Sequence, residues 1–325
     1  MPRRTIFLTG LQSLQISGDL GRGEKIGSLL KITNNKTRIA ELIPSFYKDE
    51  IGSIEFKSLR STHALIFSEF ESTHDESSNA ILQKMLRQVR EFLMATWLLE
   101  SNAINCESGF LVRQTTQGTE FSSNFFFQKF TDTHGSQLTT TWDRERLRAA
   151  RQIHNNRFKS ESETSADEPT KLVHGTERFS RTLYHISIAR SDEDIALKIA
   201  SYCAAFETLM STSQSELSHQ LSERIACLLT TEPNERVSVY RQVKEAYGVR
   251  SKVVHGATIK RSGMASLTNI SDNCDSIARS LLVRILSDEN LSKIFEGPDD
   301  QLDNFMLRTI FSSMSPAQGV GWASQ

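Results

Sequence analysis

Short apolar runs separated by turns dominate the first 130 residues, and this pattern predicts β-strands. The predicted strands lie at residues 5–8, 28–33, 53–56, 63–67 and 124–127. Because asparagine tolerates positive φ, we expect the pair Asn34-Asn35 after the second run to form a hairpin turn. Between residues 80 and 99 the apolar positions instead have helical spacing, at Ile81, Met85, Val89, Phe92 and Leu93. These patterns predict an α+β domain over residues 1–157.

From about residue 175 the apolar spacing is helical throughout. A first helix is expected to start at residues 191–194. Ser213, followed three residues later by Glu216, is a capping box for a second helix. Pro233 suits the first turn of a third helix, which Gly248 should end and whose buried face should hold Val237, Tyr240, Val243 and Tyr247.

A last long helix carries a further apolar stripe, formed by Ile270, Cys274, Ile277, Leu281 and Ile285. We therefore predict an all-α helical bundle over residues 175–290. Residues 291–325 should form a C-terminal extension with a helix at 300–313 and a loose tail. Residues 158–174 are rich in Ser, Glu, Thr and Asp and almost free of apolar side chains, which predicts a polar linker between two domains.

The charge is nearly balanced, with 38 Lys and Arg against 39 Asp and Glu, so any RNA binding must depend on local patches rather than on a basic coat. No signal peptide follows the first apolar residues, and no apolar run approaches the ~20 residues that cross a bilayer. We expect a cytoplasmic protein that does not bind membranes. Among the four cysteines, Cys203, Cys227 and Cys274 lie among helical apolar residues and should be buried thiols rather than zinc ligands or disulfides.

Two other segments invite functional interpretations. Residues 143–159 hold six basic side chains, and on a helix Arg144, Arg148 and Arg151 would share one face that could follow a phosphate backbone. The interleaved Asp143 and Glu145 favour a solvated helix face instead. The glycines of residues 21–27 fit neither a dinucleotide-binding nor a Walker spacing, so a β-turn is favoured there.

One window near the C-terminal third combines the residue types of a metal-independent ribonuclease, because Arg250 precedes His255 by five positions. Arginine binds phosphate through two hydrogen bonds, and histidine exchanges protons near pH 7. Cleavage through the ribose 2′-hydroxyl needs proton transfer at two oxygens and a cation beside the developing phosphate charge. Similar spacings occur at Arg148 to His154 and Arg178 to His185, so spacing alone does not identify the site.

The context of the window is more specific. The segment 204–210 contains Glu207 in an apolar run, residues 215–226 begin Ser-Glu-Leu-Ser-His, and residues 247–256 read Tyr-Gly-Val-Arg-Ser-Lys-Val-Val-His-Gly. In this order, residues 175–290 resemble the HEPN superfamily, and specifically its Apea-like branch. The resemblance implies a metal-independent endoribonuclease that needs no cofactor. It also implies a homodimer in which both Arg-to-His segments line one cleft.

The resemblance assigns catalytic roles to Arg250, His255 and Glu207. Arg250 would stabilise phosphate charge, His255 would transfer a proton, and Glu207 would orient one of them. A structural explanation for Glu207 is equally open, because a buried carboxylate requires a partner such as Arg250 or Arg224. We expect the window to lie at a helix start, with Arg250 in the turn after Gly248, since five helical residues rotate through about 500° and would separate the two side chains.

The neighbouring residues are candidates for RNA binding. Lys252 could contribute phosphate affinity, Ser251 could donate a hydrogen bond, and Gly256 would permit close approach of a phosphate or a partner backbone. His219 is instead expected to form an exposed helical pair with Glu223. His185 is expected to be a packing residue.

The leading expectation is therefore an endoribonuclease that cleaves RNA by 2′-hydroxyl attack in bacterial anti-phage defence, such as abortive infection. One alternative is a catalytically silent HEPN module that binds RNA or protein. Another is a regulatory subunit of a defence system, in which residues 1–157 sense a partner protein or a phage trigger.

Overall fold

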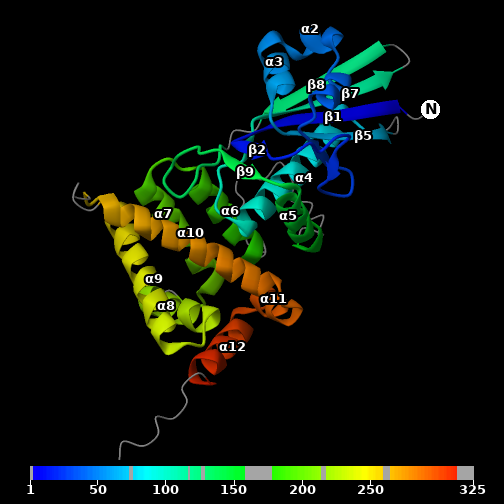
Figure 1. The fold of residues 1–325 in the computed structure, drawn as a ribbon. Helices are drawn as coiled ribbons and strands as arrows, with labels where there is room; N and C mark the ends of the chain where they lie inside the picture. Colours follow the sequence, from blue (N-terminus) through cyan, green and yellow to red (C-terminus); the bar gives the residue numbers. More distant parts are fainter. Residues whose placement is uncertain are drawn as a thin grey trace, which may run out of the picture. The chain divides into compact units, whose positions relative to one another are not determined.

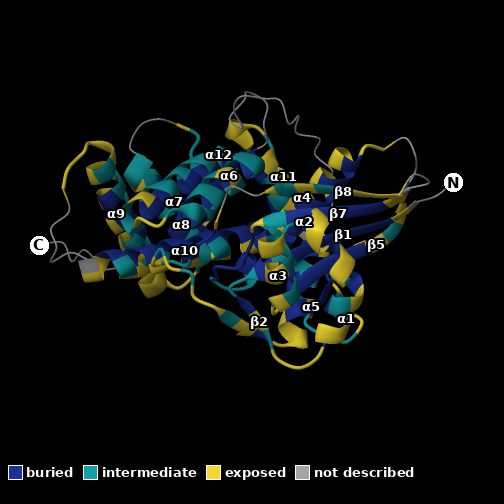
Figure 2. Ribbon diagram, turned by 90° about the horizontal axis from the view of Figure 1, so that it is seen from above, coloured by how far each residue is buried: buried dark blue, intermediate teal, exposed yellow. Residues whose placement is uncertain are grey.

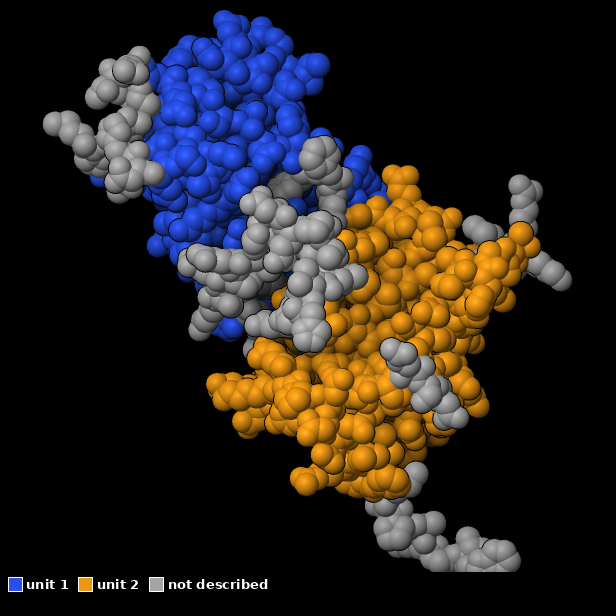
Figure 3. Space-filling view, turned by 180° about the vertical axis from the view of Figure 1, so that it is seen from behind, with its two compact units in different colours: residues 1–163 blue, residues 164–325 orange. Residues whose placement is uncertain are grey.

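The computed structural model describes residues 3–72, 76–115, 118–125, 129–157, 178–213, 217–258 and 264–312. The chain divides into two compact units, residues 1–163 and 164–325 (Figure 3). The first unit is α+β and the second is helical. The division falls within residues 158–174, which the sequence predicts as a linker and which lie outside the described residues.

An antiparallel sheet forms the centre of the first unit. The described strands run in the order β3 (Glu24–Lys25), β4 (Lys31–Thr33), β5 (Leu65–Ser72), β1 (Arg3–Gln12), β7 (Ser108–Thr115) and β8 (Gly118–Phe125). β6 (Asn105–Cys106) pairs with the end of β1, and β2 (Leu14–Ile16) pairs in parallel with β9 (Thr140–Trp142). β1 is the central strand, with Thr5 opposite Phe70 on one side and Arg113 on the other.

Helices cover both faces of this sheet (Figure 1). One face carries α1 (Lys36–Leu42), the 3₁₀ turn η1 (Ser45–Tyr47), α2 (Lys48–Ile51) and α3 (Ser53–Ser61), and the other carries α4 (Ser78–Leu99) and α5 (Arg144–Arg157). Because strand side chains alternate, Phe7 of β1 joins the core under α4 while Ile6 and Leu8 join the core under α1 to α3. β1 is therefore buried on both faces (Figure 2).

The sequence predicts most of this unit. Residues 5–8 lie in β1, most of 63–67 lies in β5, and the expected apolar face of residues 80–99 is buried in α4. Residues 28–33 form a strand only from Lys31, and β8 ends at Phe125, with residues 126 and 127 outside the described part. The turn predicted within residues 21–27 is confirmed at its start, since Gly23 N–H donates to the Leu20 carbonyl at 3.0 Å and Gly21 and Gly23 have positive φ, whereas Glu24 and Lys25 form β3.

Two predictions in this unit are wrong. Residues 53–56 begin α3 rather than a strand, because four alternating residues also fit one helical turn, and Ile54 is exposed while Leu59 is buried. Asn34 and Asn35 do not form a hairpin turn. The Asn35 side chain caps α1 by accepting from Arg38 N–H at 2.8 Å, and the Asn34 amide donates to the carbonyls of Ile16 and Gly18.

Three arginines of α5, Arg144, Arg146 and Arg148, have carboxylate partners within the unit. The Nε atoms of Arg144 and Arg148 lie 3.6 and 3.2 Å from Glu24, which agrees with the solvated-face interpretation. His154 is buried, with Nε2 3.8 Å from Glu91. The spacing from Arg148 to His154 is therefore incidental.

The described part of the second unit contains seven helices. They are α6 (Arg178–Ser191), α7 (Ile195–Met210), α8 (Leu217–Leu229), α9 (Pro233–Val254), α10 (Met264–Leu286), α11 (Glu289–Glu296) and α12 (Asp299–Ser312). α7 lies centrally and packs against α6, α8, α9 and α10. Its mostly apolar sequence explains this position, since Ile199, Cys203, Phe206 and Leu209 are buried.

Several helical predictions hold. Pro233 occupies the first turn of α9, all five apolar residues expected in the last long helix are buried in α10, and α12 provides the terminal helix. Residues 214–216 of the expected capping box and residues 313–325 of the tail lie outside the described part. Cys203 and Cys274 are buried, but Cys227 is only half-buried.

The predicted end of α9 is wrong. The helix continues through Gly248 to Val254, so the window lies at a helix C-terminus and not at a helix start. The termination signal is Gly256, whose φ of 66° is suited to glycine. The predicted buried face shifts with it, because Val237 is 48% exposed while Val243, Ala246 and Val249 are buried. No helix in the described part is long and apolar enough to cross a membrane.

Candidate functional site

One side chain of α7 and two side chains of α9 form a cluster between these helices. Arg250 Nη2 lies 3.1 Å from Glu207 Oε1 and 3.3 Å from Oε2. The Tyr247 hydroxyl donates a hydrogen bond to the same carboxylate, and the Arg250 guanidinium lies 5.2 Å from the centre of the Tyr247 ring. The side chains of Arg250 and Glu207 are 30% and 21% exposed, so this ion pair is partly shielded from water.

Helical spacing explains why Tyr247 and Arg250 converge. Residues three apart on a helix are neighbours on one face, which directs both side chains of α9 toward α7. Glu207 is in the last turn of α7 and would otherwise be a costly carboxylate in an apolar helix. Two donors from α9, one of them a cation, therefore compensate it. The expectation of an ion pair with Arg250 is confirmed, whereas Arg224 pairs with Asp303 instead.

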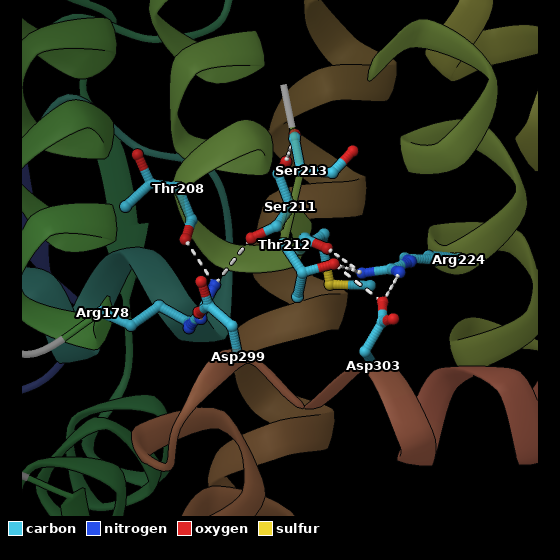
Figure 4. Close-up of polar contacts among 9 residues, drawn as sticks. Arg178, Thr208, Ser211, Thr212, Ser213, Arg224, Asp299 and Asp303 are labelled. Atoms are coloured by element: carbon cyan, nitrogen blue, oxygen red, sulfur yellow. Dashed lines mark hydrogen bonds and ion pairs between the residues drawn. The ribbon is translucent and has the colours of Figure 1, made fainter. Parts of the chain in front are cut away.

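Two buried arginines fix the end of α7 that carries Glu207 (Figure 4). Arg178 donates to the carbonyls of Thr208 and Ser211 and pairs with Asp299, and Arg224 donates to the Met210 carbonyl at 2.9 Å and pairs with Asp303. The last carbonyls of a helix lack helical donors and carry partial negative charge, which cations stabilise. The clamp holds the last turn of α7 against α6, α8 and α12. Arg178 thus serves the structure and not a second Arg-to-His site.

The surroundings of the carboxylate are apolar enough to shift nearby pKa values. Burial raises the pKa of Tyr247, and its hydrogen bond to Glu207 adds to this effect. Burial raises the pKa of the Cys203 thiol to about 12, with a further contribution from Glu207. Tyr247 and Cys203 therefore stay protonated near neutral pH.

His185 of α6 belongs to this neighbourhood. Burial lowers the pKa of its imidazole, the Glu207 carboxylate acts in the opposite direction, and Arg181 adds to the lowering. The sequence assigned His185 to packing, and it is indeed half-buried. Its position near Glu207 was not foreseen, because contact between α6 and α7 does not follow from spacing within either helix.

His255 lies elsewhere on α9. It is the exposed C-cap residue, and its backbone N–H donates to the Ser251 carbonyl at 3.1 Å. α9 is regular up to Val254, so the 500° rotation between positions 250 and 255 leaves the two about 140° apart around the axis. Arg250 faces Glu207, and His255 does not join that cluster within one chain.

Gly256 completes the helix end. Its N–H donates to the Val253 carbonyl at 3.2 Å, and the N–H of Ala257 donates to the Lys252 carbonyl at 2.8 Å, which is the Schellman pattern. The role predicted for Gly256 was close approach of a phosphate or a partner. The termination of α9 accounts for this glycine by itself. Ser251 and Lys252 are exposed on the last turn beside it.

His219 has a different partner from the one expected, Glu223. His219 is exposed, and its ring meets the ring of Tyr240 edge-on, with centroids 5.9 Å apart. Tyr247 contacts Glu207 but was not among the site residues predicted from the sequence. Its position one turn before Arg250 was the available signal.

Comparison of the chain with protein-family models, curated proteins and solved structures finds no match. Within the described ranges, no group of three or more His, Cys, Asp or Glu side chains is arranged to bind a metal ion. The chemistry available at the Arg250 cluster is a fixed guanidinium with exposed edges, a tyrosine hydroxyl and a carboxylate.

Proposed function

We propose that this protein is a HEPN-type endoribonuclease that cleaves RNA by 2′-hydroxyl attack. The observation that carries the proposal is the Arg250 guanidinium, held by Glu207 and Tyr247 at the end of a helix that His255 caps. An oriented arginine is suited to the charge that develops on a phosphate in the transition state. The HEPN assignment itself rests on the ordered segments between residues 175 and 290.

In this proposal the ribose 2′-oxygen attacks the adjacent phosphorus and loses its proton to a histidine. The bond from phosphorus to the 5′-oxygen breaks, the leaving oxygen takes up a proton, and a 2′,3′-cyclic phosphate remains. Arg250 binds the phosphate oxygens, and Glu207 and Tyr247 position the guanidinium. Lys252 and Ser251, exposed on the same turn, add phosphate contacts.

Two copies of the chain supply the complete site. Within one chain Arg250 and His255 diverge by about 140° on α9, so a single phosphate between them requires contributions from both members of a homodimer. The exposed face of α9 includes Gly248, Ser251, Lys252 and His255, and a Cβ built on Gly248 meets nothing within 4 Å. This face is open to a second copy.

The test is cleavage of RNA by purified protein in EDTA, with products analysed for 2′,3′-cyclic phosphate ends. We expect His255→Ala and Arg250→Ala each to abolish cleavage, while Arg241→Ala, an exposed arginine on the same helix, cleaves like wild type. Cleavage by His255→Ala at the wild-type rate would refute the proposal. So would absence of cleavage by wild type in every activation state, including lysate from phage-infected cells.

A second candidate is a silent HEPN module that binds RNA or a partner protein. Glu207 already satisfies Arg250, and the C-terminus of α9 carries partial negative charge that opposes a phosphate near His255. RNA binding that Arg250→Ala weakens and His255→Ala does not, without any cleavage, would support this candidate. In either case we place the protein in the bacterial cytoplasm in anti-phage defence. The α+β unit would recognise the trigger.

A further inference from the structure

A pocket of about 500 Å³ lies in the helical unit, among α8, α9, α10, α11 and α12. It does not involve Glu207, Tyr247 or Arg250. Its wall combines two arginines, Arg236 and Arg284, with apolar side chains that include Leu228, Leu291 and Phe305. Pockets for small molecules have volumes of ~300–1,000 Å³, so this pocket is large enough for such a ligand.

The two arginines differ in their partners from four other arginines of the unit. Arg178, Arg224, Arg250 and Arg279 each have a carboxylate partner. Among the described residues, Arg236 and Arg284 have no such partner within 4.0 Å, although both line the same pocket. Two cations on one wall, neither in an ion pair, favour an anionic ligand.

The acidic residue on the wall, Asp288, forms no ion pair with either arginine within 4.0 Å. Asp288 caps α11, and its Oδ1 accepts from the backbone N–H groups of Asn290 and Leu291 at 2.9 and 3.1 Å. Arg236 is held in place, since its Nε donates to the Thr230 carbonyl at 2.7 Å. This bond leaves the two terminal amino groups of Arg236 to form the paired hydrogen bonds that guanidinium makes with phosphate.

We propose that this pocket binds a nucleotide, with the phosphate between Arg236 and Arg284 and the base against Phe305 and Leu291. The half-buried Phe305 ring offers a stacking surface, and the hydroxyl oxygens of Thr231, Thr309 and Ser312 on the wall can accept hydrogen bonds from a sugar or base. Arg236 and Arg250 are 14 positions apart on α9, which is about 21 Å along the helix. The pocket is therefore a site separate from the Arg250 cluster.

The experiment is calorimetric titration of AMP, adenosine and inorganic phosphate into full-length His255→Ala protein, so that binding does not depend on RNA cleavage. We expect AMP to bind, and each of adenosine and phosphate to bind at least about tenfold more weakly. Arg284→Ala and Arg236→Ala, placed in the same background, should each weaken AMP binding about tenfold or more, as loss of a charge-assisted hydrogen bond does. Arg241→Ala, an exposed arginine outside the pocket, is the matched control.

Cys227 gives a second readout that does not require a variant to fold perfectly. It is half-buried on the pocket wall, whereas Cys106, Cys203 and Cys274 are buried. We expect AMP to slow alkylation of Cys227 in the wild-type chain. Absence of AMP binding up to millimolar concentration, equal AMP affinity in Arg284→Ala, or phosphate binding as tight as AMP would each overturn the proposal.

Discussion

Tyr247 and Arg250 lie one helical turn apart on α9 and hold the same carboxylate, that of Glu207 on α7. Neither interaction is local in the sequence, because about 40 residues separate each donor from its acceptor. The triad fixes the guanidinium at one end of the helical unit. It also connects α9 to the turn of α7 that Arg178 and Arg224 clamp.

Removing the charge of Glu207 should release Arg250 without changing the shape of the site. We expect Glu207→Gln to lower RNA cleavage by about 10- to 100-fold, since a misplaced catalytic group is costly, and to reduce the free energy of unfolding by about 1 kcal/mol. Tyr247→Phe keeps the ring beside the guanidinium and should have a smaller effect on both. Cleavage assays and urea unfolding measure the two quantities.

Glu245→Gln is the matched control for that substitution, because Glu245 is exposed on α9. It should leave both cleavage and stability near wild type. If Glu207→Gln lost stability but cleaved normally, Glu207 would be a structural partner of Arg250 and no more.

A mixing experiment tests the two-copy site. Arg250→Ala and His255→Ala should each be inactive alone, whereas mixed dimers contain one chain with an intact Arg250 and one with an intact His255. We expect the mixture, after subunit exchange, to regain up to about half the activity per mixed dimer, because one of its two composite positions is complete. Persistent inactivity of verified mixed dimers would place the arginine and the histidine of one site in the same chain.

The sequence was most informative where a long periodic pattern selected one structure. The 22 residues of α4 and the apolar stripe of α10 leave no competing interpretation, and both were predicted. The strand predicted at residues 53–56 is wrong because four residues are too few to distinguish strand alternation from a helical turn. The hairpin turn predicted at Asn35 is wrong because an asparagine side chain suits both a turn and a helix cap.

The end of α9 illustrates a different limit. Gly248 and Gly256 are both plausible termination signals, and only the backbone distinguishes them, since Gly248 is helical and Gly256 has a φ of 66°. Because the helix ends at Gly256 and not at Gly248, the segment from Arg250 to His255 lies at a helix end rather than at a helix start. The two side chains therefore point in different directions. Arg250 was one of the two partners inferred for Glu207 from the cost of burying a carboxylate. The contribution of His185 depends on how α6 packs on α7, which no local pattern specifies.

The two glycines should respond oppositely to the same substitution. Gly248→Ala should stabilise the protein by about 0.5–1 kcal/mol, because the residue is exposed inside a helix and an added Cβ meets nothing within 4 Å. Gly256→Ala should destabilise it by about 1–2 kcal/mol, because its left-handed backbone disfavours a Cβ even in open space. Thermal or urea unfolding of the two variants measures the difference. Destabilisation by Gly248→Ala would instead indicate that a partner backbone packs closely on α9.

The clamp at the end of α7 should make stability depend on acid pH through Asp303. The hydrogen bond from Thr212, 2.8 Å long, and the ion pair with Arg224 hold the pKa of Asp303 below its usual value. A depressed folded-state pKa means that the unfolded chain takes up the proton first. The contribution of Asp303 is therefore fully present above the unfolded pKa of about 3.9 and is lost as pH falls through the lower folded-state pKa.

We expect Asp303→Asn to unfold at lower urea concentration than wild type above about pH 5, with the gap narrowing as pH falls below about 4. The effect should be modest because the Asp303 side chain is 44% exposed. Asp300→Asn, an exposed position in the first turn of the same helix, removes the same formal charge but no ion pair and should show a smaller gap, due to the helix dipole alone. If the difference in urea stability between wild type and Asp303→Asn stays constant from pH 6 to pH 3, the carboxylate charge contributes nothing. The clamp then acts through the neutral hydrogen bond from Thr212.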